Sequence, residues 1–399
     1  MAQDTEKPHT RSALALTALA YLPDVLAMMT VGVIVPFIAV LCREFGATAA
    51  ELGLAIAFFS MPTAVLATLG GGLIDRYGVR RSMLVAGCIS ALASFLASQA
   101  HSLIAFDCAM LLAGVGFGGI CVSAPSLVIR SLEGGARIRA MSFLSTFAPT
   151  GYAAGLLLAV PLVDEGDWRL ALRIHAAIMA LMFVVMLRYL PRIDAGPGTQ
   201  REPARRTLAQ MLSVLREPRA LRLGIAVALP NALSYGTSLA APAYLARVHD
   251  LSIATSSATV AFAKIAAMVI GGLSMGYLLS RSVGTTMLFA IMATLGAVAQ
   301  VVLFLPASGM LLATSALILW LFAFGGMAGG AMTLLPTVVR EPERSGAASG
   351  LINQFISAAS FATPSTWLAL HDGVQFMVLA FACLLLSVIA LPSAASQAR

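Results

Sequence analysis

The chain has 399 residues, of which 59% are hydrophobic and 11% are charged, and its mean hydropathy is +0.90. A soluble domain is usually about 45–50% apolar and about 25% charged, so this composition excludes a soluble globular protein. The apolar residues form continuous runs without polar alternation, which excludes a transmembrane β-barrel and predicts membrane-spanning helices. The net charge of +7 does not indicate nucleic-acid binding, because the arginines gather on one side of these runs.

Taken in chain order, the apolar runs divide into twelve stretches of about 20 residues, the length that a helix needs to cross a bilayer. The first run is too long for a cleaved signal peptide, so we count it as a span. A break rich in Pro, Gly and Arg separates six runs from the next six. The predicted spans are 14–41, 50–73, 82–99, 103–126, 139–162, 168–190, 221–245, 254–279, 285–305, 309–334, 346–369 and 374–392.

The distribution of arginines predicts the orientation of the spans. By the positive-inside rule the arginine-rich side is cytoplasmic, so we expect a multi-pass protein of the cytoplasmic (inner) membrane. Within the break, Thr207 to Arg222 has the pattern of an amphipathic helix on the membrane surface. The expected parts are a cytoplasmic N-terminus (1–13), a six-helix bundle (14–190), a cytoplasmic linker (191–220), a second six-helix bundle (221–392) and a cytoplasmic C-terminus (393–399).

Glycines and a proline repeat at a constant offset of 211 residues between the fourth and tenth runs. Small residues spaced four apart let membrane helices approach closely. The repeat predicts an all-α membrane protein of two pseudo-symmetric six-helix bundles. The paired positions are Gly114 with Gly325, Gly118 with Gly329, Gly119 with Gly330 and Pro125 with Pro336.

A dense set of charges lies between the second and third runs. Gly78 permits a tight turn, and Arg80 with Arg81 holds that turn at an anionic membrane face. The full spacing is Gly71-x-Leu73-x-Asp75-Arg76-x-Gly78-x-Arg80-Arg81. This segment resembles the signature loop that the major facilitator superfamily carries between its second and third transmembrane helices.

The resemblance implies a secondary transporter with twelve helices, two halves and a substrate site between them. It also implies a gate in which Asp75 and Arg80 hold the cytoplasmic ends of the halves together. The expected gating residues are Gly71, Asp75, Arg76, Gly78, Arg80 and Arg81. Asp167-Trp168-Arg169 is similar to the family's usual entry to span six.

Two departures from family patterns bear on the substrate. Met110 stands where an arginine often tied to proton coupling commonly precedes the glycine run of span four. Span five has Ala148-Pro149 but lacks the glycine-rich pattern, with its Gly-Pro pair, of drug/proton antiporters. Both departures make a multidrug exporter the second choice.

Lys264 is the leading candidate for substrate binding. It lies near the middle of the eighth predicted span, roughly 15 Å deep at 1.5 Å per residue. A charged group there costs roughly 2.5–3.5 kcal/mol by insertion scales, so its presence indicates a function. In the family that the loop resembles, span eight borders the central cavity. We therefore predict that Lys264 binds a carboxylate or another small anion, with a structural ion pair as the alternative.

Asp24 is the predicted proton-coupling residue. It lies near the middle of the first span, directly after Pro23, and Tyr21 shares its helix face. A carboxyl in a low-dielectric cavity favours its neutral form, so it is suited to carrying a proton. Alternatively, Asp24 neutralises Lys264. The two are compatible, because protonation of Asp24 would release Lys264 for an anion.

Neutral polar residues form stripes on spans seven and eleven. A helix facing lipid would not carry such rows, so they either join helices or line the cavity. Family members that carry dicarboxylates often have a second basic residue in span eleven, where Asn353 and Gln354 stand here, so one anionic group is expected on the substrate. Trp320 forms a cavity wall or simply packs. The predicted substrate-binding residues are Lys264, Tyr21, Asn231, Tyr235, Asn353, Gln354, Ser357 and Trp320.

Other chemistry is not expected. Asp107 lies near the outer end of span four, and His175 is interpreted as a packed, hydrogen-bonded side chain. The five cysteines show no metal spacing, so we expect inert thiols, no metal and no cofactor. A Walker-type motif and a nucleophile–base arrangement are both absent from the sequence, so we expect neither ATP hydrolysis nor enzyme activity.

The predicted function is proton-coupled transport of a small organic anion, a monocarboxylate, by alternating access. The expected partners are this small molecule, protons and membrane lipids, without nucleic acid, and the expected state is a monomer. The alternative is a drug or metabolite exporter, a proton antiporter in which Asp24 binds a cationic or neutral compound. A non-transporting membrane sensor is the remote alternative.

Overall fold

The computed structural model describes residues 10–144, 146–191, 218–281, 283–334, 345–370 and 372–392, and this part of the chain is helical without a strand. By length and composition, nine described helices are long and apolar enough to cross a membrane. Two further apolar helical stretches, Ala49–Thr63 and Phe147–Val163, are shorter. The described helices follow the twelve predicted runs in order, as expected for an all-helical polytopic membrane protein.

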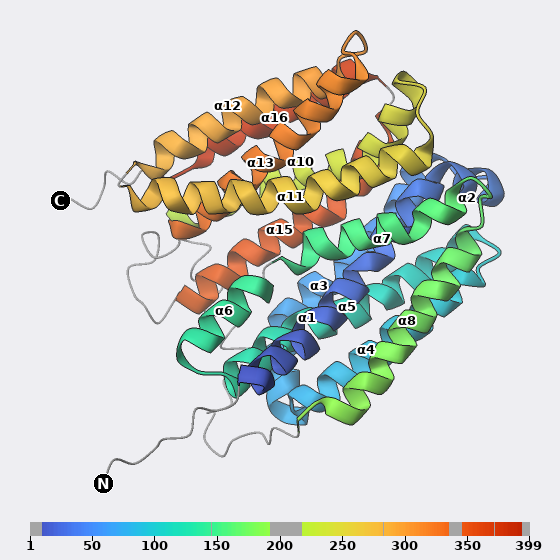
Figure 1. Cartoon of the computed structure of the whole chain (residues 1–399), viewed down its shortest axis with the longest axis vertical. Helices are drawn as coiled ribbons and strands as arrows, with labels where there is room; N and C mark the ends of the chain where they lie inside the picture. Colours follow the sequence, from blue (N-terminus) through green and yellow to red (C-terminus); the bar gives the residue numbers. More distant parts are fainter. Residues whose placement is uncertain are drawn as a thin grey trace.

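Two groups of helices lie side by side, coloured blue to green and yellow to red in Figure 1. We call them the first half and the second half. The first half contains α1 (Thr10–Ile34), η1 (Val35–Phe37), α2 (Ile38–Phe45), α3 (Ala49–Tyr77), α4 (Val79–Ser98), α5 (Leu103–Ser131), α6 (Gly134–Leu144), α7 (Phe147–Val163) and α8 (Trp168–Tyr189). The second half contains α10 (Pro218–Val248), α11 (Ile253–Ser280), α12 (Thr285–Phe304), α13 (Met310–Thr333), α15 (Ser345–Leu368) and α16 (Gly373–Ala390).

Two predicted runs are interrupted helices. The first run changes to a 3₁₀ turn at Val35–Phe37 because Pro36 lacks the N–H that an α-helix needs, and it ends at Gly46 with φ 63°. The fifth run divides into α6 and α7. Pro149 lies in the first turn of α7, where its missing N–H interrupts the helix at lowest cost.

Equivalent helices pack together in the two halves. In the first half, α3 and α4 pack on α5, α1 packs on α7, and α4 packs on α8. In the second half, α11 and α12 pack on α13, α10 packs on α15, and α12 packs on α16. Each pair in the second half occupies the place of its counterpart in the first, so the helix packing repeats between the halves.

The repeated glycines make equivalent helix contacts. A Cβ atom built on Gly114 of α5 would lie 2.3 Å from the carbonyl oxygen of Phe59 in α3. A Cβ atom built on Gly325 of α13 would lie 2.2 Å from the carbonyl oxygen of Met268 in α11. Both distances are far below van der Waals contact, so each position accepts only glycine. The offset of 211 residues therefore corresponds to the same close backbone approach in both halves.

The helices run between two ends of the molecule. We call the end that holds Gly78 the Gly78 end, and the opposite end, where α2 gives way to α3, the Gly46 end. The halves touch through α3 with α15 and through α7 with α11. A Cβ atom built on Gly53 would lie 2.6 Å from the carbonyl oxygen of Pro364, so backbones of opposite halves meet near the Gly46 end.

A cluster of polar side chains joins α2 to α8 at the Gly46 end. Glu44 forms an ion pair with Arg169 and accepts a hydrogen bond from Trp168 Nε1 at 2.7 Å. Arg169 also donates to the carbonyl oxygen of Ala100 at 2.8 Å, and Asp167 caps the first turn of α8. This cluster explains the Asp167-Trp168-Arg169 motif as the start of α8 held by a carboxylate at the end of the first span.

Some predictions lie outside the described residues. The predicted amphipathic helix begins at Thr207, and its residues up to 217 are not described, whereas α10 begins at Pro218. Pro336, the last member of the repeat, also lies outside them. The limits of the linker and of the two terminal segments stay predictions.

Candidate transport site

Lys264 lies near the middle of α11, where that helix meets α7 of the opposite half. Its side chain is buried, with an exposed fraction of 7%. The ammonium nitrogen Nζ donates a hydrogen bond to Ser238 Oγ of α10 at 2.6 Å and lies 4.5 Å from the ring centroid of Tyr152 in α7. An ammonium over an aromatic face is attracted by the ring quadrupole, the more so where water is excluded.

Tyr152 and Ser238 complete this group. The Tyr152 hydroxyl donates to the backbone carbonyl oxygen of Ser238 at 2.6 Å, and Ser238 Oγ donates to the carbonyl oxygen of Ser234 at 2.6 Å. Both side chains are buried. Lys264, Ser238 and Tyr152 therefore form one buried group that spans the boundary between the halves, and we call it the Lys264 group.

The Lys264 group contains no acid. Among the described residues, the ion pair that the structure contains is Arg169 with Glu44, and no carboxylate oxygen lies within 4 Å of Lys264 Nζ. The predicted alternative in which Asp24 neutralises Lys264 is therefore not what the structure shows. A buried ammonium without a counter-ion is costly, because it loses hydration that neutral hydrogen-bond partners replace only in part.

Asp24 lies near the middle of α1 and is 1% exposed. Its Oδ1 atom is enclosed and has no hydrogen-bond partner among the described residues. Close by, His175 of α8 binds the carbonyl oxygen of Leu26 through Nε2 at 2.8 Å and Ser94 Oγ of α4 through Nδ1 at 2.9 Å. His175 is fully buried, so the structure agrees with its interpretation as a packed, hydrogen-bonded residue.

Tyr21 bonds within the first half and lies apart from the Lys264 group. Its hydroxyl donates to Thr150 Oγ1 at 2.9 Å and shares a hydrogen bond of 3.1 Å with Thr146 Oγ1. Its ring stacks on Phe143 at 4.2 Å between centroids. These contacts fasten α1 to the start of α7, so the structure gives Tyr21 a packing role in this conformation.

The polar stripe of span seven faces the interior of the molecule. Ser234, Tyr235 and Ser238 are buried, and Asn231 is half-buried. The Tyr235 hydroxyl is enclosed and makes no hydrogen bond of regular geometry among the described residues, although the Ser60 side chain of α3 lies near enough to interact with it. An enclosed hydroxyl with unused bonding capacity is a suitable contact for a polar ligand, so the stripe stays a candidate lining.

The predicted substrate-binding residues of α13 and α15 differ in their surroundings. Gln354 and Ser357 of α15 are half-buried, and the side chain of Asn353 lies outside the described ones. Trp320 is fully buried and packs within the second half, where a Cβ atom built on Gly296 of α12 would lie 2.9 Å from its ring. That position is the packing alternative predicted for Trp320.

The signature loop forms the turn that its glycine predicts. Gly78 adopts φ 80° and ψ 152° between α3 and α4, a conformation that side chains other than glycine rarely accept. Arg80 donates from Nε to the carbonyl oxygen of Leu190 at 3.0 Å and from Nη2 to that of Leu187 at 2.8 Å. Gly71, Asp75 and Arg76 fall in α3, but their side-chain surroundings are outside the described part, and Arg81 is exposed.

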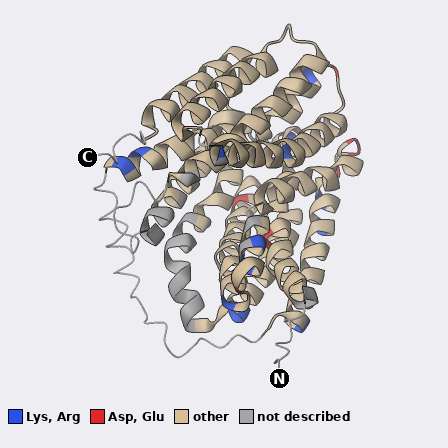
Figure 2. Ribbon diagram, turned by 60° about the vertical axis from the view of Figure 1, so that its left-hand side comes forward, with Lys and Arg blue, Asp and Glu red and all other residues tan. Residues whose placement is uncertain are grey.

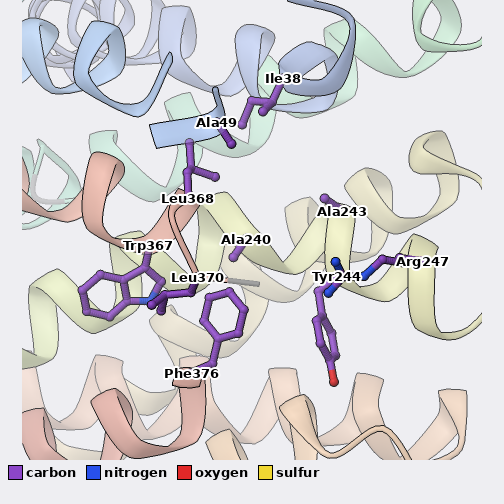
Figure 3. Close-up of a pocket in the computed structure, with 10 residues that line it drawn as sticks. All are labelled: Ile38, Ala49, Ala240, Ala243, Tyr244, Arg247, Trp367, Leu368, Leu370 and Phe376. Atoms are coloured by element: carbon purple, nitrogen blue, oxygen red, sulfur yellow. The ribbon is translucent and has the colours of Figure 1, made fainter. Parts of the chain in front are cut away.

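A separate cavity of about 290 Å³ lies near the Gly46 end. Residues of both halves line it, with Ile38 and Ala49 from the first half and the others from the second, as Figure 3 shows. Its walls are mainly aliphatic and aromatic, and Arg247 is its one charged lining residue. Its lining contains none of the predicted substrate-binding residues.

Two members of the Lys264 group were not predicted as binding residues. Ser238 belongs to the stripe of span seven, so the period of polar residues was sufficient to find it. Tyr152 lies in a mainly apolar helix without a polar stripe, and its partner is 86 residues away. Charged residues elsewhere along the described helices are sparse, as the mainly tan ribbon of Figure 2 shows, so Lys264 stands out by charge alone.

Comparison with known proteins identifies the family. The sequence profile of the Major Facilitator Superfamily matches residues 24–364. Curated relatives include the probable sulfoacetate transporter SauU of Cupriavidus necator, 26% identical over 165 residues, which are 41% of this chain and 38% of that protein. They also include the quinolone resistance protein NorA of Staphylococcus aureus, 20% identical over 178 residues, 44% of this chain and 46% of that protein. The chain thus spans less than half the length of these relatives.

Solved structures show the same fold. A bacterial homolog of the human lysosomal transporter spinster, in an inward-facing and unoccupied conformation, has a TM-score of 0.74 at 14% identity, covering 96% of this chain and 95% of that one. The nucleoside transporter NupG has a TM-score of 0.74 at 14% identity, covering 95% and 97%. The fold agrees with these two transporters over nearly the whole length of the chain, and because the family profile spans most of the sequence, the protein belongs to the Major Facilitator Superfamily.

Proposed function

We propose that the protein transports a small organic anion with one carboxylate group, by alternating access and with proton coupling. The observation that supports the anion is the buried Lys264 ammonium, which has no acidic partner among the described residues. A carboxylate entering between the halves would supply the missing counter-ion and form charge-assisted hydrogen bonds with Nζ. The likeness to a probable sulfoacetate transporter supports an anionic substrate as well.

Asp24 is the proposed proton carrier. Its enclosed oxygen lacks a hydrogen-bond donor among the described residues, and a neutral carboxyl is the less costly form in such a place. Protonated Asp24 would leave Lys264 as the charge near the middle of the described helices, which favours anion binding. The other predicted side chains, Tyr235 and Ser357 among them, would hydrogen-bond the remainder of the substrate.

The Gly78 end is the proposed cytoplasmic end, because the arginine-rich loops predict this orientation in the cytoplasmic membrane. The contact between Gly53 and Pro364 then lies on the outer side. The likeness to an inward-facing spinster homolog supports a state closed to the outside. In this state Arg80 binds α8 of its own half, so a gate formed by Asp75 and Arg80 between the halves would belong to the opposite state.

A drug or metabolite exporter is the second candidate, supported by the likeness to NorA and by the isolated Asp24 carboxyl. In that case Asp24 would bind a cationic or neutral compound. Lys264 opposes a cationic one, since an ammonium in the same site repels it.

Uptake by proteoliposomes tests the anion. We would measure accumulation of labelled acetate, lactate, benzoate and sulfoacetate with and without an inward proton gradient. Lys264→Ala should lower the affinity for the transported acid by about 10- to 150-fold, the value of a charge-assisted hydrogen bond. Arg281→Gln removes a cation from the Gly78 end of the same helix and should transport as the wild type does.

Two results would contradict the proposal. Wild-type uptake by Lys264→Ala would show that the ammonium does not bind the substrate. Efflux of cationic dyes that persists in Lys264→Ala, without uptake of any of the acids, would favour the exporter.

A further inference from the structure

We propose that the Tyr152 ring covers the Lys264 ammonium when no substrate is bound and moves away from it when an anion binds. Tyr152 would then link anion binding to separation of the two halves. Tyr152 is then a positioning residue that acts through Lys264. The part of this inference that concerns the anion rests on the proposed function. The part that concerns contact between the halves does not.

The first step is that Tyr152 holds the Lys264 group from the other half. Lys264 and Ser238 belong to α11 and α10 of the second half, whereas Tyr152 belongs to α7 of the first. Tyr152 contributes two contacts across the boundary, the ring face at 4.5 Å from Nζ and the hydroxyl at 2.6 Å from the Ser238 carbonyl oxygen. All three side chains are buried, so water does not weaken either contact.

The second step is electrostatic. The face of an aromatic ring carries partial negative charge, which attracts the ammonium and repels a carboxylate. An anion therefore does not bind between Nζ and the ring. Nζ already donates one of its three hydrogens to Ser238 Oγ, and the ring covers another side of the ammonium. On this proposal, a carboxylate that takes its place at Nζ displaces the ring and not the Ser238 hydroxyl.

The third step concerns the halves. Displacement of the ring leaves Lys264 bound to Ser238 within its own half and removes the cation–π contact to the other half. Occupancy by an anion thus weakens the connection between α7 and α11. A ligand shifts a conformational equilibrium by its differential affinity for the two states, and the ring supplies that difference here.

Two substitutions separate the contacts of Tyr152. Tyr152→Phe keeps the ring over Lys264 and removes the hydroxyl that binds Ser238. Tyr152→Leu removes both contacts and keeps a smaller apolar side chain at the boundary. Tyr244→Phe is a matched control, since its hydroxyl binds the carbonyl oxygen of Phe304 at 2.6 Å within the second half.

Distance measurement by electron paramagnetic resonance tests the halves without any substrate. Spin labels would be placed at Ile104→Cys in α5 and Leu311→Cys in α13, which are 75% and 84% exposed near the Gly46 end, after replacement of the five native cysteines by alanine. Without an anion, Tyr152→Leu should populate longer distances than the wild type, with Tyr152→Phe in between. Equal distance distributions in monodisperse Tyr152→Leu and wild-type protein would overturn the inference.

Binding measurement by isothermal titration tests the displacement, with acetate, lactate, benzoate and sulfoacetate as probes. Removal of the competing ring should tighten binding in Tyr152→Leu by about 3- to 30-fold, whereas Tyr152→Phe should stay near the wild type. Weaker or unchanged binding in Tyr152→Leu would show that the ring does not compete. If none of these acids binds any variant, the proposed function fails, and the substrate-free distances still decide whether Tyr152 holds the halves.

Discussion

Asp24 lies near the middle of α1 and Lys264 near the middle of α11, and both ionisable side chains are buried. The two helices belong to opposite halves. The separate roles proposed for them rest on the absence of an ion pair between them among the described residues. An ion pair between Asp24 and Lys264 would have given both residues a structural role. Two separate buried groups instead allow one to exchange a proton while the other binds an anion.

Asp24→Asn tests the proton role. Asparagine keeps the size and polarity of the side chain but carries no exchangeable charge. Gradient-driven accumulation of the transported acid should fall to background in proteoliposomes, while exchange of labelled for unlabelled acid continues. Asp107→Asn removes a carboxylate from α5 outside the proposed site and should accumulate normally. Accumulation by Asp24→Asn at the wild-type level would exclude Asp24 as the coupling residue.

His175 is a structural counterpart to these residues. Its two ring nitrogens join α8 to α1 and α4, and the side chain is fully buried. His175→Ala should lower stability by about 1–3 kcal/mol, because it leaves buried polar groups without their partner. A thermal-unfolding assay in detergent would show a lower Tm than for Arg173→Gln, a substitution at an exposed position two residues earlier in the helix. An unchanged Tm would mean that the two hydrogen bonds contribute nothing net.

At the scale of elements, glycines decide how closely the helices pack. Gly114 and Gly325 each face a backbone carbonyl of the helix two spans earlier, and the sequence repeat predicted their equivalence. The same close crossing in both halves explains why these positions repeat, whereas the surrounding apolar residues vary. Packing of α5 on α3 and of α13 on α11 thus depends on the absence of a side chain.

Gly325→Val tests this dependence. A valine at this site would overlap the Met268 carbonyl oxygen, 2.2 Å from the first side-chain carbon, and separate α13 from α11. We expect a large loss of folded protein in size-exclusion chromatography. Gly276→Ala is the control, because a Cβ atom there meets nothing within 4 Å, and removal of a helix-interior glycine should be neutral or stabilise by about 0.5–1 kcal/mol. Equal yields of the two variants would contradict the packing argument.

At the scale of the whole molecule, the halves meet along two helix pairs, α3 with α15 and α7 with α11. The first pair includes the backbone contact at Gly53, and the second includes the Lys264 group. The Gly46 end is thus held by shape, and the middle is held by polar bonds. In the proposed alternating-access cycle, movement of the halves would open the first contact and change the second.

Gly53→Ala tests the contact at the Gly46 end. The added methyl group would lie 2.6 Å from the Pro364 carbonyl oxygen, so it disfavours close approach without entering the core of either half. The label pair at positions 104 and 311 should report longer distances than in the wild type, with little change in thermal stability. A wild-type distance distribution would show that α3 and α15 adjust to the methyl group and do not set the state of the transporter.

Local signals determined the class and the family. Continuous apolar runs predicted the helices in order, because the bilayer requires apolar segments of one length. The turn at Gly78 was predicted from the backbone freedom of glycine, whereas the division of the fifth run into α6 and α7 was not predicted. The offset of 211 residues predicted the repeated packing. Lys264 and Asp24 were found as candidates because charge within an apolar run is rare.

Only the tertiary structure decided which side chains meet. Tyr152 and Ser238 are 86 residues apart, Lys264 and Ser238 are 26 apart, and Arg80 and Leu190 are 110 apart. No local pattern encodes such contacts, because they depend on how the two halves and their helices pack. The sequence by itself therefore determined a helical membrane protein of twelve apolar runs with charges in its middle, and the packing decided that Lys264 faces Tyr152 of the other half in place of Asp24.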